Sequence, residues 1–197
     1  MKTKPITFLL SLFFLFLFIG SVCGEEPEVK REYYDSGKLK SETHYKNGKK
    51  EGLETRWHES GKKSIETHYK NGSQEGLETN WYESGAKKVE GHFKNGKPEG
   101  LATGWYESGA KKGEVHYKNG KKEGLQTGWY KNGRKEYSER YKNDKLEGMR
   151  TEWYESGKKK STSHFKNGIE SGFRKEWNKN GKLTYQGNFV DGNEEIK

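Results

Sequence analysis

The chain has 197 residues, of which 28% are hydrophobic and 34% are charged, and its formal net charge is +9. So few aliphatic residues would by themselves indicate disorder. They exclude a globular domain built around a large aliphatic core. The single cysteine, Cys23, also excludes an intrachain disulfide. Any folded structure must therefore follow from the order of the residues.

The first 24 residues have the layout of a secretory signal peptide. Lys2 and Lys4 form a basic start, residues 6–19 are almost entirely apolar, and a short stretch of mostly small residues ends at Gly24. The apolar run is shorter than the roughly 20 residues that a membrane-spanning helix needs. We therefore expect residues 1–24 to be removed by cleavage after Gly24 and the mature protein to be secreted, periplasmic or held in the cell envelope.

Cys23 leaves a minor alternative, a lipoprotein whose lipid is attached to this residue. Two neighbours argue against lipidation of Cys23. Gly20 stands where a lipoprotein signal has leucine, and Val22 stands where it has a small residue. The preferred interpretation is a cysteine inside a discarded leader.

We expect a short linker over residues 25–32, a repeat array over residues 33–192 and a C-terminal tail over residues 193–197. Tryptophan recurs every 24 residues, at Trp57, Trp81, Trp105, Trp129, Trp153 and Trp177. A second aromatic column has the same step, at Tyr45, Tyr69, Phe93, Tyr117, Tyr141, Phe165 and Phe189. A third column is a glycine followed by an apolar residue, as in Gly76 and Leu77. These columns indicate about six and a half 24-residue repeats.

Each repeat contains two turn signals, Lys-Asn-Gly and Glu-Ser-Gly, between short aromatic-rich segments. Such dipeptides indicate β-hairpins, because glycine adopts a positive φ without steric cost. We expect no α-helix after the leader and about 13 strands. The predicted turns are centred near Asn47, Ser60, Asn71, Ser84, Asn95, Ser108, Asn119, Asn132, Asn143, Ser156, Asn167 and Asn180.

The aromatic columns all fall at odd-numbered positions, which favours three-residue loops at the turns. Such loops would keep the columns on one face of the sheet, whereas two-residue loops would place tryptophans and tyrosines on opposite faces. We therefore expect one apolar face and one polar face. The predicted apolar face contains Thr67, Tyr69, Leu77, Thr79, Trp81, Val89 and Phe93. The glycine column, including Gly76, is expected on the polar face, where it permits close approach or marks a bulge.

The repeat resembles the MORN repeat in its variant form. Residues 117–125 (Tyr-Lys-Asn-Gly-Lys-Lys-Glu-Gly-Leu) and residues 129–133 (Trp-Tyr-x-x-Gly) have the matching pattern, and the resemblance extends over residues 33–192. It implies an all-β fold, an elongated single-layer antiparallel meander of stacked hairpins. It also implies a binding or scaffold protein, since proteins with these repeats act in that way and some bacterial members are antitoxins of toxin–antitoxin systems.

The aromatic columns are the candidate binding residues. They comprise the six tryptophans together with Tyr69, Phe93, Tyr117 and Tyr141. A row of aromatic platforms would suit a protein partner, self-association or a polysaccharide. Lysine clusters at residues 46–50 and 118–122 could instead attract an anionic membrane surface, although interspersed glutamates weaken the field. A nucleic-acid partner is disfavoured by the leader.

Catalytic, metal and cofactor sites are not predicted. The histidine column recurs every 24 residues, so its members lie too far apart to share one zinc ion, and two copies have Arg140 or Asn188 instead. No catalytic motif interrupts the repeats. The sequence thus predicts an exported, non-enzymatic protein that binds a protein through its aromatic face. The alternatives are an antitoxin that neutralises a toxin by direct binding, and an envelope protein that binds polysaccharide or a membrane surface.

Overall fold

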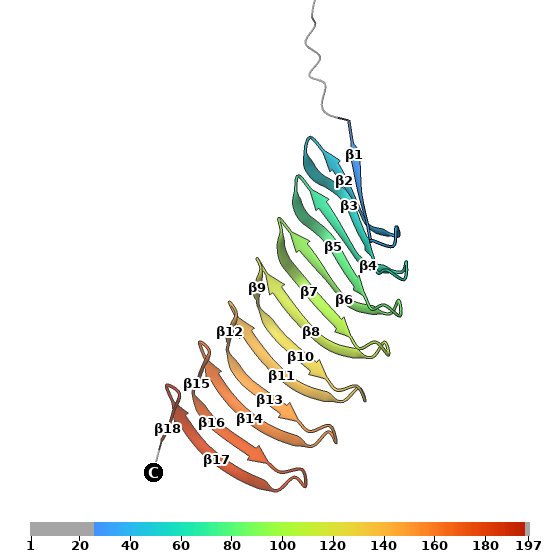
Figure 1. Cartoon of the computed structure of the whole chain (residues 1–197). Coiled ribbons are helices and arrows are strands. Elements are labelled where there is room, and N and C mark those ends of the chain that lie inside the picture. Colours follow the sequence, from blue (N-terminus) through green and yellow to red (C-terminus); the bar gives the residue numbers. More distant parts are fainter. Residues whose placement is uncertain (1–25, 196–197) are drawn as a thin grey trace, which may run out of the picture.

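The computed structural model describes residues 26–195 as one open antiparallel sheet, in which consecutive hairpins are stacked side by side (Figure 1). The predicted signal peptide, with Cys23 and Gly24, lies outside the described residues. The strands of the first half are β1 (Glu28–Tyr33), β2 (Leu39–Lys46), β3 (Lys49–Trp57), β4 (Lys63–Lys70), β5 (Ser73–Trp81), β6 (Lys87–Lys94), β7 (Lys97–Trp105), β8 (Lys111–Lys118) and β9 (Lys121–Lys122). Those of the second half are β10 (Gly124–Trp129), β11 (Lys135–Lys142), β12 (Lys145–Leu146), β13 (Gly148–Trp153), β14 (Lys159–Lys166), β15 (Ile169–Glu170), β16 (Gly172–Trp177), β17 (Leu183–Val190) and β18 (Asn193–Glu194).

The prediction of an all-β meander is confirmed, and each predicted turn is found between the strands named above. Residues 26–195 contain no helix, and so none long and apolar enough to cross a membrane. There are 18 strands, where about 13 were expected. Turns before Lys38 and at Asp191–Gly192 extend the meander at both ends, and bulges divide several later strands in two.

The two turn signals form loops of different length. In the Lys-Asn-Gly turn, Lys46 pairs directly with Lys49, and Asn47 and Gly48 have φ values of 51° and 70°. This is a two-residue loop with the positive φ values of a type I′ turn. The prediction of a three-residue loop is therefore wrong at these turns.

The Glu-Ser-Gly turn has the predicted three-residue loop. The Gly61 N–H donates to the His58 carbonyl at 2.8 Å, and the His58 N–H donates to the Lys62 carbonyl at 2.8 Å. Gly61 closes the loop with a φ of 87°. A type I turn followed by a left-handed glycine gives this geometry.

The mixture of loop lengths divides the aromatic columns between the two faces. Leu77 is directly opposite His92, and Trp81 follows it at alternate positions along β5. Asn80, on the other side of β5, is opposite Val89. Directly paired residues share a face and neighbours along a strand alternate. Tryptophan and tyrosine columns therefore lie on opposite faces, as two-residue loops require.

The predicted single apolar face is thus wrong. We call one side the tryptophan face, with Leu77, Thr79, Trp81 and their equivalents in other repeats. The opposite side is the tyrosine face, with Thr67, Tyr69, Val89, Phe93 and their equivalents.

The glycine column marks a bulge, which is one of its two expected roles. Tyr69 pairs with Gln74 and Thr67 pairs with Glu78, so β5 has two extra residues between these pairs. Gly76 is one of them and has a φ of 98°. It is opposite Phe93, on the tyrosine face, so its predicted placement on the face opposite that aromatic column is wrong.

Side chains of one repeat satisfy backbone groups of the next along both edges of the sheet. At the Glu-Ser-Gly edge, the Tyr82 hydroxyl donates to the Trp105 carbonyl at 2.8 Å. Equivalent bonds join Tyr34 to Trp57, Tyr106 to Trp129, Tyr130 to Trp153 and Tyr154 to Trp177. At the Lys-Asn-Gly edge, the Glu99 carboxylate accepts the Asn119 N–H at 2.7 Å. Equivalent bonds join Asn71 to Glu51, Asn95 to Glu75, Asn143 to Glu123 and Asn167 to Glu147.

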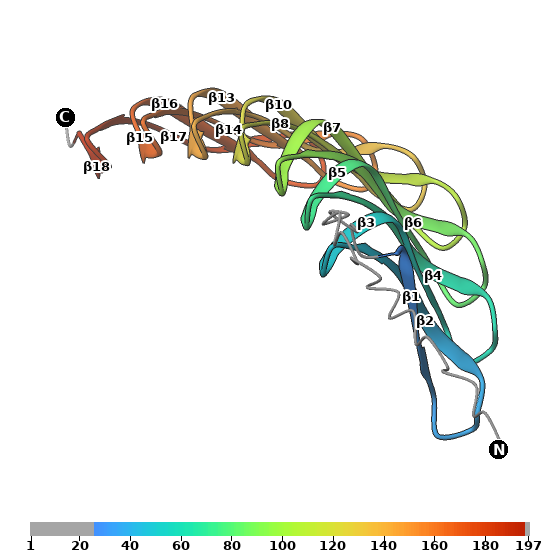
Figure 2. The ribbon, with the colours of Figure 1, turned by 90° about the horizontal axis from the view of Figure 1, so that it is seen from above.

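The sheet has no conventional hydrophobic core. None of the hydrophobic side chains in residues 26–195 is fully buried, and the buried residues are polar or charged. They are Ser41, Thr43, Glu54, Thr55, Thr67, Thr79, Thr127, Glu139 and Ser163. Figure 2 shows the single layer bending into an arc from β1 to β18. Stability must come from contacts between neighbouring repeats, as in other solenoid-like proteins.

Two glycines in one strand should respond oppositely to alanine. Gly100 has a φ of 77° and open space where a Cβ would lie, so Gly100→Ala should destabilise through backbone strain alone, by about 1–2 kcal/mol. Gly104 lies outside the left-handed region, and its Cβ would be 3.7 Å from the Lys88 carbonyl oxygen. Gly104→Ala should therefore stabilise the strand by about 0.5–1 kcal/mol. Urea unfolding midpoints measure both, and a lower midpoint for Gly104→Ala would contradict the assigned backbone geometry.

Candidate functional site

The tryptophan face carries a line of exposed apolar side chains beside the tryptophan row. The line follows the glycine bulge, and its exposed fractions are 41% for Leu101, 49% for Leu125, 53% for Met149 and 60% for Phe173. The tryptophans are half-buried. The Lys87 Nζ lies 5.8 Å from the centre of the Trp105 ring, one repeat on. Tryptophans and leucines thus form two parallel apolar rows on one open surface.

The histidines of the tryptophan face bond to the backbone. The His44 Nδ1 lies 2.7 Å from the Leu53 carbonyl oxygen, and the His68 Nδ1 lies 3.2 Å from that of Leu77. A carbonyl only accepts, so Nδ1 carries the proton in both bonds. Within residues 26–195, no group of three or more His, Cys, Asp or Glu side chains is arranged to hold a metal ion.

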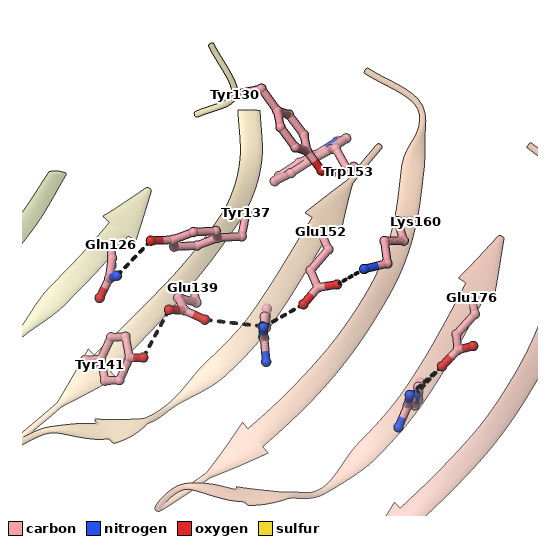
Figure 3. A network of polar contacts seen from close by, with 11 residues as sticks. Gln126, Tyr130, Tyr137, Glu139, Tyr141, Glu152, Trp153, Lys160 and Glu176 are labelled. Atoms are coloured by element: carbon pink, nitrogen blue, oxygen red, sulfur yellow. Dashed lines mark hydrogen bonds and ion pairs between the residues drawn. The ribbon is translucent and has the colours of Figure 1, made fainter. Parts of the chain in front are cut away.

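The tyrosine face carries a chain of polar contacts in the second half of the array (Figure 3). Glu139, only 7% exposed, accepts a hydrogen bond from the Tyr141 hydroxyl at 3.0 Å. Its other oxygen lies 3.2 Å from the Arg150 Nε. Arg150 also pairs with Glu152 at 2.5 Å, and Lys160 pairs with Glu152 at 3.1 Å. The network links three neighbouring strands, β11, β13 and β14.

A second buried carboxylate lies near the other end of the tyrosine face. Glu54 is 3% exposed and pairs with Lys50 at 2.5 Å and with Arg56 at 2.6 Å. Burial acts to raise the pKa of Glu54, but the two cations outweigh it and hold this pKa below its ordinary value. Buried charges are tolerated here because each is paired.

Two hollows open on the tyrosine face. One, of about 510 Å³, is lined by charged residues that include Arg150, Glu152, Lys160, Arg174 and Glu176. The other, of about 420 Å³, has a different lining, with small and apolar residues that include Val89, Ala102, Gly104, Gly113 and Val115. The first is charged in both signs and internally paired, so it is a structural network. The second has unused apolar surface.

Sequence reasoning placed the candidate aromatic residues on one surface, and the structure separates them. Tyr69, Phe93, Tyr117 and Tyr141 are half-buried on the tyrosine face, away from the tryptophans. It also missed the column two residues after each bulge glycine. This column varies along the array and consists of Glu54, Glu78, Ala102, Gln126, Arg150 and Arg174. Its variation at a fixed period was the available signal.

The family of MORN repeat variants matches residues 29–47, 50–71, 74–95, 98–119, 146–167 and 174–191. These segments cover more than half of the chain, which therefore belongs to this family of repeat proteins. MORN repeats are generally protein- or membrane-binding modules, and the family is generally non-enzymatic. A search of the curated proteins found no match. The sheet continues without interruption through residues 120–145, which lie between two matched segments.

Tyr141 should be among the last tyrosines to ionise. Burial and the hydrogen bond to Glu139 raise the pKa of Tyr141 from 10.0 to about 12. Because this pKa is raised on folding, the associated stabilisation is complete below pH 10 and is lost as the pH approaches 12. Tyr141→Phe should remove one late component from the alkaline absorbance titration of the folded protein.

Tyr185 provides the matched control for this titration. Its hydrogen bond to Glu194 raises the pKa of Tyr185 to about 12 as well, so Tyr185→Phe should remove a component of equal amplitude. A late component unchanged by Tyr141→Phe would contradict the contact between Tyr141 and Glu139.

Proposed function

We propose that this chain is an exported, non-enzymatic repeat protein that binds a protein partner across its tryptophan face. The observation that carries the proposal is the line of exposed Leu101, Leu125, Met149 and Phe173 beside the tryptophan row. Contiguous exposed apolar surface of this kind marks interaction sites in soluble proteins. The proposal moves the predicted interface to one face of the sheet and separates it from the tyrosine column.

The apolar rows can supply an interface of ordinary size. Each large aromatic side chain contributes about 150–250 Å² of buried surface. A typical protein interface buries about 800 Å² on each partner. Three neighbouring repeats, each presenting a tryptophan and a leucine-type residue, reach this area. The centre of the array, around Trp105 and Trp129, has such neighbours on both sides.

The lysines of the sheet are poorly suited to dominate the interaction. Lys50 pairs with Glu54, Lys62 donates to the Ser84 carbonyl at 2.9 Å, and Lys158 donates to the Asn180 carbonyl at 3.2 Å. Charges already engaged in this way contribute little to binding and are screened by salt. An anionic membrane surface is therefore the weaker candidate partner.

The absence of catalysis is part of the proposal. It is supported by the generally non-enzymatic character of the family and by the pairing of the charged groups on the tyrosine face. Catalysis requires groups held free to act on a substrate in a concave site. The paired carboxylates instead hold adjacent strands together.

Cell fractionation distinguishes export from the antitoxin alternative. An exported protein should be recovered outside the cytoplasm and without Lys2 and Lys4. Full-length protein confined to the cytoplasm would overturn export and favour an antitoxin that neutralises a toxin by direct binding. Sedimentation with insoluble glycans, dependent on the tryptophans, would favour a polysaccharide ligand instead of a protein.

Replacing Trp105 and Trp129 together with alanine should reduce protein capture at least tenfold, because it removes the centre of the apolar surface. The measurement is a pull-down with the mature protein, quantified by mass spectrometry. Phe93→Ala with Tyr117→Ala is the matched control, since it removes two rings from the opposite face of nearby strands. Far-ultraviolet circular dichroism checks that both variants retain the sheet. If only the Phe93 and Tyr117 variant loses capture, the tryptophan face is the wrong face.

A further inference from the structure

A row of paired residues crosses five adjacent strands on the tyrosine face and has no side chains at its centre. Val89 pairs with Gly104, Gly104 with Gly113, Gly113 with Gly128, and Gly128 with Tyr137. Strands in a sheet are about 4.8 Å apart. Gly104 and Gly113 therefore leave bare backbone about two strands wide, which forms the floor of the 420 Å³ hollow.

The backbone does not require glycine at either position. Neither Gly104 nor Gly113 has a positive φ, unlike the glycines of the turns and bulges. A Cβ at Gly104 would lie 3.7 Å from the nearest atom, and one at Gly113 would lie 3.6 Å from the Thr127 carbonyl oxygen. These are ordinary contact distances. Glycine inside a strand is destabilising relative to alanine, so the open space has no evident structural benefit.

One repeat further on, the same place is filled by an aromatic ring of the protein itself. A Cβ built on Gly128 would come within 2.3 Å of the Tyr137 ring, so this ring lies directly against the Gly128 backbone. Gly104 and Gly113 occupy the positions of Gly128 and Tyr137 in the preceding repeat. The hollow therefore has the floor on which Tyr137 packs, without the ring.

We propose that the hollow over Gly104 and Gly113 binds the phenyl ring of a phenylalanine side chain from a protein partner. The ring would lie on the glycine backbone as Tyr137 lies on Gly128, between Val89 on one side and Tyr137 on the other. This site is on the face opposite the tryptophans, so it goes beyond the proposed function and does not depend on it.

The surroundings select a ring without a hydroxyl group. The Tyr137 hydroxyl is bonded to the Gln126 side-chain amide at 3.1 Å. One repeat earlier, Ala102 occupies the position of Gln126 and pairs with Val115. The tip of a ring in the hollow would therefore contact apolar groups. A tyrosine hydroxyl there would lose water without gaining a partner, which is costly.

The open shape of the hollow favours a protein side chain over a free aromatic molecule. The sheet is a single layer, so no second layer covers the outer surface of a bound ring. Small-molecule sites usually bury most of their ligand. A ring that belongs to a partner protein is covered by that partner instead.

An NMR titration of the mature protein tests the site. The probes are the N-acetyl amides of phenylalanine, tyrosine and leucine, and toluene serves as a free aromatic molecule. The phenylalanine probe should give saturable shifts of the Gly104, Gly113 and Val115 amides in the millimolar range, at least threefold tighter than the tyrosine or leucine probe. Toluene should bind more weakly than the phenylalanine probe.

Gly113→Tyr supplies the decisive variant, because its own ring should occupy the hollow as Tyr137 does over Gly128. It should abolish these shifts, while Gly113→Ala retains most of them and shows that a side chain alone is tolerated. Equal binding of leucine and phenylalanine probes, shifts that persist in Gly113→Tyr, or no saturable shift would each overturn the proposal. Toluene binding as tightly as the phenylalanine probe would overturn the protein side chain as occupant. Capture through Trp105 and Trp129 should be unaffected by Gly113→Tyr, so the two proposals fail separately.

Discussion

The structure depends on hydrogen bonds from side chains of one repeat to the backbone of the next. A single-layer sheet without a buried hydrophobic core cannot rely on apolar burial within one hairpin. The Tyr106 hydroxyl reaches the Trp129 carbonyl at 2.7 Å, and the Glu99 carboxylate reaches the Asn119 N–H at 2.7 Å. Each bond spans 20 or 23 positions in the sequence, which is nearly one repeat. Such contacts add up along the array in the way expected of a one-dimensional assembly.

These bonds also explain why the repeat has its particular letters. The tyrosine after each tryptophan satisfies a carbonyl at one edge, and the glutamate before each bulge glycine satisfies an N–H at the other. Copies that differ preserve the contact where the chemistry permits. His58 stands in a tyrosine position, and its Nε2 lies 3.2 Å from the Trp81 carbonyl oxygen. The period of the sequence is therefore the period of its inter-repeat bonds.

The sequence was sufficient to predict the repeat, the positions of the turns and the antiparallel meander, because glycine and asparagine mark those turns by their φ preferences. It was not sufficient to assign the faces. Asn47–Gly48 is compatible with a two- or a three-residue loop, and a change of one residue in loop length reverses the side on which Trp57 lies relative to Tyr45. Paired charges such as Glu139 with Arg150 were also missed, because their contact joins neighbouring strands whose register follows from the loops and bulges.

The division of labour between edges and centre has a functional consequence. Contacts at the two edges hold the repeats together, so the central positions of each strand are free to differ. On the tyrosine face they change from the buried Glu54, through the bare Gly104 and Gly113, to Arg150 and Arg174. On the tryptophan face they remain apolar throughout. One framework thus presents a uniform surface on one side and a graded surface on the other.

The central claim is tested most directly by the urea unfolding midpoint of Tyr106→Phe, which removes one inter-repeat hydrogen bond and keeps the ring. The reference is Tyr33→Phe, because Tyr33 is 58% exposed and its hydroxyl donates no hydrogen bond within residues 26–195. We expect Tyr106→Phe to lose about 0.5–1.5 kcal/mol of unfolding free energy, the usual contribution of one such bond, and Tyr33→Phe to be unchanged. Identical midpoints for Tyr106→Phe and the unmodified protein would contradict the account.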